Sequence, residues 1–346
     1  MKRSGSHMII ALSLVLIAFI VIATGYGALS ISPLNVIGII LEPLGYTGSE
    51  ASPQESAVLW AIRLPRVTLA VLVGATLAVS GTLLQGLFRN PLAEPGLIGI
   101  SAGASLAAAF FMVCGAQLLA HLSPIWELFA LPIVAFIGAI SCAILIHRAS
   151  IIQGRTSIAT MLLAGIAFNA IGFAFLGVLQ YIADDQQLRS LTFWMLGSLG
   201  GATWDVLIFT APMMILTITL APLLAHSLNL LQLGEAEASH LGIDIEWLKR
   251  IAVLIVALGV GAAVSVSGMI GFIGLVVPHI IRMAYTPNHR ILLPASALLG
   301  GIILLGADLI SRTVVMPAEM PVGIVTTLIG APFFMILLMK HRMSVQ

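Results

Sequence analysis

Long apolar runs alternate with short polar segments along almost the whole chain. The best-defined run lies between Arg66 and Arg89, where twenty-two residues contain no Asp, Glu, Lys or Arg. At about 1.5 Å of rise per residue, such a helix crosses a hydrocarbon core roughly 30 Å thick. The prolines of Asn90-Pro91 and Glu94-Pro95 then interrupt the helix, because proline lacks an amide hydrogen and disfavours helical geometry in the residue before it. The pattern predicts two membrane spans joined by a tight polar turn.

The gaps between charged residues predict ten membrane spans in total. They cover residues 8–29, 63–88, 96–114, 128–146, 157–181, 204–225, 251–266, 271–284, 291–310 and 323–339. The stretch 251–281 is too long for one upright span, and Ser267-Gly268 provides a break, so the eighth span should be short. Two short helices are expected outside the membrane, one at Pro33–Leu41 and one within residues 182–203, where Arg189–Thr203 is too short and glycine-rich to cross.

Composition narrows the class of protein. Of 346 residues, 60% are hydrophobic and 8% are charged, and the mean hydropathy is +1.12. A soluble chain of this length needs many more charges to cover its surface, so the sequence predicts an all-α polytopic membrane protein in contact with a lipid bilayer. Cys114 and Cys142 lack the spacing of a metal or redox site, so no cofactor or metal is expected. The sequence contains no basic stripe that would indicate a nucleic-acid partner.

The distribution of cations predicts the orientation of the chain. With alternate loops assigned to alternate sides, eleven of the fifteen Lys and Arg residues fall on one side, which the positive-inside rule makes cytoplasmic. Both termini are expected on that side. The four outer cations are Arg63, Arg66, Arg189 and Arg312. They are candidates for a function at the outer face, and the alternative is that they anchor span ends at the membrane interface.

A short internal repeat indicates how the spans are arranged. Gly74–Gly81, with the sequence GATLAVSG, is echoed by Gly261–Gly268, with the sequence GAAVSVSG. The match pairs spans two to five with spans seven to ten. Because five crossings separate the two copies, they must run in opposite directions, as in the inverted repeats of transport proteins. The alternatives are a chance match and a simple use of small residues for close helix packing.

The longest inner loop, residues 226–250, differs from the other inner loops in length and charge. Glu235, Ala238 and Leu241 follow at three-residue spacing on one predicted helix face, and Gly242 stands where a left-handed residue ends a helix. The loop is expected to contact a protein partner on the cytoplasmic face, although it could also be only a connector.

Several short motifs, spread over essentially the whole chain, carry a family resemblance. They are Arg63-Leu64-Pro65-Arg66, Gly81 with Gln85, Asn90-Pro91-Leu92-Ala93-Glu94-Pro95, Gly96 with Gly99, the GE-x-x-A-x-x-LG string from Gly234 to Gly242, Gly271-Phe272-Ile273-Gly274-Leu275, Pro278-His279 with Arg282, Ala307-Asp308 with Arg312, Glu319-Met320-Pro321-Val322-Gly323 and Gly330-Ala331-Pro332. In this order they resemble the permeases of the iron-chelate and cobalamin uptake family of ABC importers, the FecCD type.

The resemblance implies the type II ABC importer permease fold, with residues 1–346 forming one transmembrane domain in the bacterial inner membrane. Its expected partners are a second copy of the chain, two cytoplasmic ATP-binding subunits and a periplasmic substrate-binding protein. The sequence contains no G-x-x-x-x-G-K-[ST] phosphate loop, so the chain is not expected to be an enzyme itself. ATP would be used by the partner subunit.

The resemblance also implies roles for particular residues. The residues expected to dock the binding protein are Arg63, Arg66 and Arg312. The residues expected to couple to the ATPase are Gly234, Glu235, Ala238, Leu241 and Gly242. The residues expected near the inner gate are Asn90 and Leu92.

The expected substrate is haem. The string Tyr181–Ser198 is similar to the corresponding region of haem permeases, and within it Arg189 and Trp194 would offer a cation and a flat ring to the substrate path. A ferric siderophore or cobalamin is the alternative within the family, because anionic chelates also suit a cation. An ion-coupled secondary transporter is a more remote alternative, since almost every charge lies at a span end rather than in mid-span.

Overall fold

The computed structural model describes residues 2–27, 29–45, 51–115 and 124–343, and most of these residues lie in helices. Ten helices correspond in order to the ten predicted spans. They are α1 (Lys2–Gly25), α4 (Leu64–Phe88), α5 (Ile100–Cys114), α7 (Pro124–Ala149), α8 (Ile158–Ile182), α10 (Trp204–Leu220), α13 (Ile245–Ser267), α14 (Ile273–Ala284), α15 (His289–Thr313) and α16 (Val322–Met343). The predicted all-α membrane architecture is confirmed.

The helices differ in whether they can cross a bilayer alone. Among the described residues, seven helical segments are long and apolar enough to do so, and they contain α1, α4, α7, α8, α10, α13 and α15. By contrast, α5 has 15 residues, α14 has 12, and the apolar part of α16 is also short. The short eighth span predicted from the break at Gly268 therefore matches α14. The count of ten complete crossings stays a prediction.

Local sequence signals explain where several helices begin. A side-chain oxygen of the preceding residue accepts a hydrogen bond from a backbone amide in the first turn of α8, α10 and α13. The capping residues are Ser157, Thr203 and Asp244. Such caps satisfy amides that have no partner inside the helix. At the other end of α4, Arg89 adopts a left-handed conformation directly before Asn90-Pro91, as the predicted polar turn requires.

One expected boundary needs correction. The helix that leads into α4 begins at Pro53, not near Arg63, because Ser52 and Glu55 form a capping box that starts α3 (Pro53–Val58). This helix continues through the π-helical turn η2 (Leu59–Arg63) into α4, so Arg63 and Arg66 lie inside a continuous helical segment that runs from Pro53 to Phe88.

The short outer helices are both present. The first, α2 (Pro33–Leu41), has the predicted bounds and is followed by the short turn η1 (Glu42–Leu44). The second, α9, covers only Asp185–Met195, because Asp184 caps its first turn and the left-handed Gly197 follows its end. The remainder of the predicted range, up to residue 203, is irregular.

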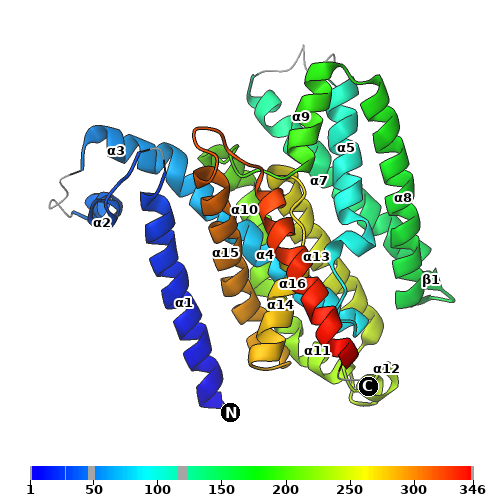
Figure 1. Ribbon diagram of the computed structural model, residues 1–346. Helices are drawn as coiled ribbons and strands as arrows, with labels where there is room; N and C mark the ends of the chain where they lie inside the picture. The colour runs from blue at the N-terminus through cyan, green and yellow to red at the C-terminus, as the bar shows by residue number, and fades with distance from the viewer. Residues whose placement is uncertain (1, 28, 46–50, 116–123, 344–346) are drawn as a thin grey trace.

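The ends of the chain lie on one side of the molecule. Figure 1 shows both termini at the end of the helix bundle where α12 (Glu235–His240) lies, and α9 at the opposite end. The same end carries α11 (Ala225–Leu231), which follows the short turn η4 (Ala221–Leu224). A two-stranded hairpin, β1 (Ile151–Ile152) with β2 (Arg155–Thr156), joins α7 to α8 there.

The packing of the two halves agrees with an inverted repeat. Helix α4 packs against α14 and α15 of the second half, and its counterpart α13 packs against α5 and α7 of the first half. Figure 1 shows that α4 starts from the α3 end of the molecule and α13 from the α12 end, so they run in opposite directions. These two helices are also the most deeply buried of the long spans.

Glycine permits the closest contact between the halves. A Cβ atom built on Gly81 of α4 would lie 1.8 Å from the carbonyl oxygen of Gly274 on α14. Any larger residue there would force the two helices apart. The repeat string ending at Gly81 thus marks a helix crossing, the role that small residues commonly have in membrane proteins.

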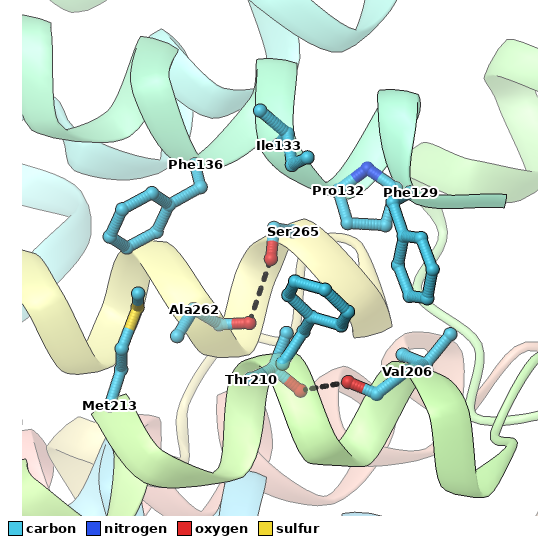
Figure 2. Close-up of a pocket in the computed structure, with 10 residues that line it drawn as sticks. Phe129, Pro132, Ile133, Phe136, Val206, Thr210, Met213, Ala262 and Ser265 are labelled. Atoms are coloured by element: carbon cyan, nitrogen blue, oxygen red, sulfur yellow. Dashed lines mark hydrogen bonds between the residues drawn. The ribbon is translucent and has the colours of Figure 1, made fainter. Parts of the chain in front are cut away.

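A small apolar pocket lies between α7, α10 and α13 (Figure 2). Its two hydroxyls are already used within their own helices, since Thr210 donates to Val206 O at 2.9 Å and Ser265 donates to Ala262 O at 2.9 Å. The remaining lining is hydrocarbon and aromatic, with the rings of Phe129 and Phe209 in contact. The two hydroxyls therefore have no hydrogen left to donate to a ligand, and only their oxygens could accept a hydrogen bond.

Candidate functional site

Five charged residues gather where η2, α4 and α15 meet, at the end of the molecule opposite to α12. We call them the outer arginine cluster: Arg63, Arg66, Asp308, Arg312 and Glu319. A cavity of about 690 Å³ lies beside the cluster and is lined by its three arginines and Glu319. Three cations and two carboxylates give the cluster a formal charge of +1.

Arg66 bridges two carboxylates. Its Nε and Nη2 atoms each lie 2.9 Å from Asp308 Oδ1, and its Nη1 donates to both carboxylate oxygens of Glu319, at 2.8 and 2.9 Å. The two partners differ in exposure, since the Asp308 side chain is 0% exposed and the Glu319 side chain is 49% exposed. The forked guanidinium suits such paired recognition of carboxylates.

Arg63 and Arg312 instead hold the end of α1. Arg63 donates to Thr24 O at 2.7 Å, to Gly25 O at 2.8 Å and to Leu29 O. Arg312 donates to Tyr26 O at 2.8 Å and to Ala23 O. The last carbonyls of a helix have no partner inside the helix and form the negative end of its dipole, so two guanidiniums stabilise this terminus.

The structure changes the expectation for these arginines. The sequence suggested a set of cations at the outer face, but Arg63 and Arg66 bind different partners. Arg63 and Arg312 are buried, with 5% and 9% exposed, and 11% of the Arg66 side chain is exposed. Their role in docking stays a prediction, and a partner can reach them only beside existing contacts.

The inner loop contains the short helix α12, which two glycines delimit. Gly234 and Gly242 have φ angles of +130° and +88°, which confirms the left-handed conformation expected at Gly242. Ala238 is buried, whereas Leu241 is 58% exposed. Leu241 is the C-cap residue of α12, and its backbone N–H still donates to Glu237 O at 3.1 Å. The coupling role of these residues stays a prediction.

A buried lysine ties this loop to the rest of the chain. Lys249 Nζ donates to Glu235 Oε2 at 3.0 Å and to Thr156 O at 2.9 Å, and its side chain is only 3% exposed. Glu246 accepts a hydrogen bond from Thr156 N at 2.9 Å. The first residue of α12 is thus connected to α13 and to the β1–β2 hairpin, so a movement of the loop would be transmitted to two elements.

Three large apolar residues that flank α12 in the sequence are exposed, and the sequence reasoning identified only one of them. We call them the inner apolar patch: Leu233, Leu241 and Trp247, which are 63%, 58% and 54% exposed. Leu233 and Trp247 were missed. Their signal was available, since each is a large apolar residue in a loop that also carries four acidic residues.

The predicted inner gate forms a compact turn. Asn90 Oδ1 accepts a hydrogen bond from Leu92 N at 2.9 Å, and Leu92 is 38% exposed. A cavity of about 310 Å³ adjoins Asn90 and is also lined by Gln85 and Arg282. Gln85 links the halves, because its Oε1 accepts from Arg282 Nη1 at 3.0 Å while its Nε2 donates to Gly274 O at 3.3 Å. The gating role stays a prediction.

A second polar cavity, of about 300 Å³, lies between the turn after α4 and the break between α13 and α14. Glu94 and Asn169 contribute to its lining, and Asn169 Nδ2 donates to Gly96 O at 2.9 Å. Burial raises the pKa of the Glu94 carboxyl. The sequence reasoning gave no role to either side chain, although an amide within the apolar run of α8 was a visible signal.

Arg189 and Trp194 both belong to α9 but do not form one surface. They are five positions apart, which places their side chains about 140° apart around a helix of 3.6 residues per turn. Arg189 is exposed, whereas Trp194 is partly buried and packs against the main core. A contribution of either residue to a substrate path stays a prediction.

The comparison with known proteins decides the family. Residues 14–340 match the FecCD transport family. The chain belongs to this family. Within the FecCD relatives, the hemin transport system permease HmuU of Yersinia pestis is 50% identical over 281 residues, which cover 81% of this chain and 83% of that protein. The vitamin B12 import permease BtuC of Klebsiella pneumoniae is 41% identical over 303 residues, with 85% and 86% coverage.

The fold agrees with that of a solved ABC transporter structure. An ABC transporter of the metal-chelate type, determined in an inward-facing conformation, superimposes with a TM-score of 0.84 at 32% sequence identity. The match covers 97% of this chain and 99% of that one.

Within the ranges that the structure describes, no three His, Cys, Asp or Glu residues are grouped so that they could hold a metal ion.

Proposed function

We propose that this chain is the transmembrane permease subunit of an ATP-driven importer that moves haem across the bacterial inner membrane. The observation that carries the choice of haem is the 50% identity with the hemin permease HmuU, against 41% with the vitamin B12 permease BtuC. Cobalamin and ferric siderophores are the alternative substrates within the family.

The proposed complex contains a second copy of the chain. Helix α8 supports this, because only 22% of its most apolar 18-residue stretch is buried within the protomer. Large side chains of this helix, such as Phe173, Phe175 and Tyr181, are exposed. A bilayer can cover part of this surface, and a partner helix the rest. The substrate would pass between the two copies, with the inner gate at Asn90 and Leu92.

The energy would come from two ATP-binding subunits that bind the inner apolar patch and α12. The excess of Lys and Arg at this end supports a cytoplasmic location for it and for both termini. Gly234, Glu235 and Ala238 would hold the loop in shape, while Leu241 would enter the partner. The periplasmic binding protein would dock on the outer arginine cluster at the other end.

Transport by the assembled complex tests the proposal. The permease, its ATP-binding subunit and its binding protein are reconstituted in liposomes, and haem, cyanocobalamin and ferrichrome are offered separately with ATP inside. We expect haem uptake that stops when the ATP-binding subunit is omitted. If cyanocobalamin or ferrichrome is taken up and haem is not, that compound replaces haem as the proposed substrate. Uptake driven by an ion gradient without the ATP-binding subunit would make the chain a secondary transporter.

A further inference from the structure

Each guanidinium nitrogen of Arg66 already contacts a carboxylate. Nε and Nη2 contact Asp308, and Nη1 contacts Glu319. An acidic side chain arriving from outside therefore finds no nitrogen of Arg66 without an anionic neighbour. Three of its five N–H groups donate hydrogen bonds to these carboxylates, and the other two, on Nη2, lie beside the buried Asp308. If the binding protein docks on the exposed side of this arginine through a carboxylate, it competes there with Glu319.

The two carboxylates differ in how easily they can leave. Asp308 is fully buried within α15 and also lies 3.3 Å from the Nε atom of Arg312, so its departure would leave buried guanidiniums without a counter-charge. Glu319 is half-exposed and lies on the segment between α15 and α16. Because the Glu319 side chain is already 49% exposed to solvent, its carboxylate can leave Arg66 and remain solvated.

The backbone beside Glu319 does not have to move for this exchange. Met320 N donates to Ser311 O at 3.0 Å, and the Ser311 hydroxyl donates to Met320 O, which fixes the residue next to Glu319 on the end of α15. Close packing fixes the start of α16 as well, because a Cβ on Gly323 would lie 2.2 Å from Leu196 O. The exchange is therefore a rotation of one side chain.

We propose that Glu319 is an internal competitor of the binding protein: it occupies Arg66 when the binding protein is absent, and an acidic side chain of the binding protein replaces it on docking. This inference rests on the proposed docking role of the outer arginine cluster. The exchange of one carboxylate for another leaves the charge at Arg66 unchanged. Glu319 thus sets the docking affinity without being a docking contact itself.

The competition has a measurable consequence. A binding site that is free for only part of the time has an apparent dissociation constant raised by the inverse of that fraction. If Glu319 occupies Arg66 for most of the time, its removal should tighten docking by about two- to fivefold. Salt also screens the half-exposed Arg66–Glu319 pair, so the tightening should be larger at low salt than at high salt.

The test uses the full transporter, with its ATP-binding subunits, in lipid nanodiscs, and titrates labelled binding protein at low and high salt. Glu319→Gln should bind two- to fivefold more tightly than wild type at low salt, and by a smaller factor at high salt. The matched control is Glu42→Gln, which removes one exposed negative charge from the outer turn η1, away from the cluster. At each salt concentration, the control should tighten docking less than Glu319→Gln does.

Two results would overturn the competitor role. Unchanged or weaker docking of Glu319→Gln would show that Glu319 does not compete. Equal tightening by Glu42→Gln would reduce the effect to net charge.

Arg66→Gln separates this inference from the docking proposal. Weaker docking of Arg66→Gln together with unchanged docking of Glu319→Gln would remove the competitor and keep the docking site. Unchanged docking of a folded Arg66→Gln would remove the docking site itself. If Arg66→Gln does not fold, Arg66→Lys takes its place, because it keeps the charge next to Asp308 and loses the fork that holds a second carboxylate.

Discussion

The two ends of the molecule present opposite kinds of surface. At the outer end, the functional candidates are arginines that are buried and bound by their own chain, to Asp308, to Glu319 and to the end of α1. At the inner end, the candidates are exposed apolar residues around α12, and the charged residue beneath them, Lys249, is buried as an anchor.

This difference indicates two modes of partner binding. The inner apolar patch can be covered directly by a partner, since large apolar side chains already lie in the open and their burial stabilises a complex. The arginines of the outer arginine cluster already contact carboxylates or carbonyls of their own chain, so a partner has to bind beside or in place of an existing contact. We therefore expect a lasting contact with the ATP-binding subunits and a reversible one with the binding protein. The predictions below probe this contrast, from the largest expected effect on stability to the smallest.

Asp308→Ala should be the most destabilising change, because it leaves the buried guanidiniums of Arg66 and Arg312 without their shared carboxylate. We expect a loss of about 3–5 kcal/mol in the free energy of unfolding. Chemical unfolding of the detergent-purified permease measures it. The matched control is Glu319→Gln, whose exposed pair should cost less than about 1 kcal/mol. A similar small loss for both variants would show that the cluster is not an internal structural unit.

Lys249→Met should destabilise the inner end by about 1–3 kcal/mol, because Thr156 O and the Glu235 carboxylate lose their buried donor while the volume is kept. Hydrogen exchange of the amides in α12 should become faster at the same time. Arg250→Met serves as the control, since the neighbouring Arg250 side chain is exposed. Unchanged exchange in the Lys249 variant would contradict its anchoring role.

Gly242→Val should lower the stability of the native loop conformation by about 1–2 kcal/mol, because a β-branched residue is strained at a φ of +88°. A Cβ at this position meets no atom within 4 Å, so the effect is conformational and not steric. We expect the assembled transporter to lose most of its substrate-stimulated ATPase activity. Gly45→Val imposes the same strain on the outer face, where φ is +94° and no atom lies near. It should leave ATPase stimulation intact, and an equal loss in both variants would rule out a specific coupling role.

Leu241→Ser should leave the stability of the permease nearly unchanged, since the side chain is 58% exposed. Association with the ATP-binding subunit should weaken by about three- to tenfold, the scale on which an apolar interface anchor is lost. Titration of the purified subunits measures it. Leu34→Ser, at an 82% exposed position of α2, is the control for a lost surface leucine. Full affinity of the Leu241 variant would remove this residue from the inner contact.

Local signals in the sequence were sufficient for most of the fold. The apolar runs predicted where the long helices lie, Gly268 marked the break before α14, and Gly242 has the left-handed conformation that its position suggested. Where a boundary was wrong, a local signal had been overlooked: the capping box at Ser52 and Glu55 starts the helix before α4. Such features depend on residues within a few positions of each other.

The candidate sites show what the sequence determined and what it left open. It determined which residues belong to the loop around α12, and that arginines lie near the outer ends of helices, because both follow from spacing and charge along the chain. Only the tertiary structure decided the partners of those arginines: Arg66 meets Asp308, 242 positions away, and Arg312 meets the carbonyl of Ala23, 289 positions away. The physical reason is that a buried charge pairs with whichever opposite charge or carbonyl the helix packing brings within about 3 Å, and that packing is settled by the whole chain.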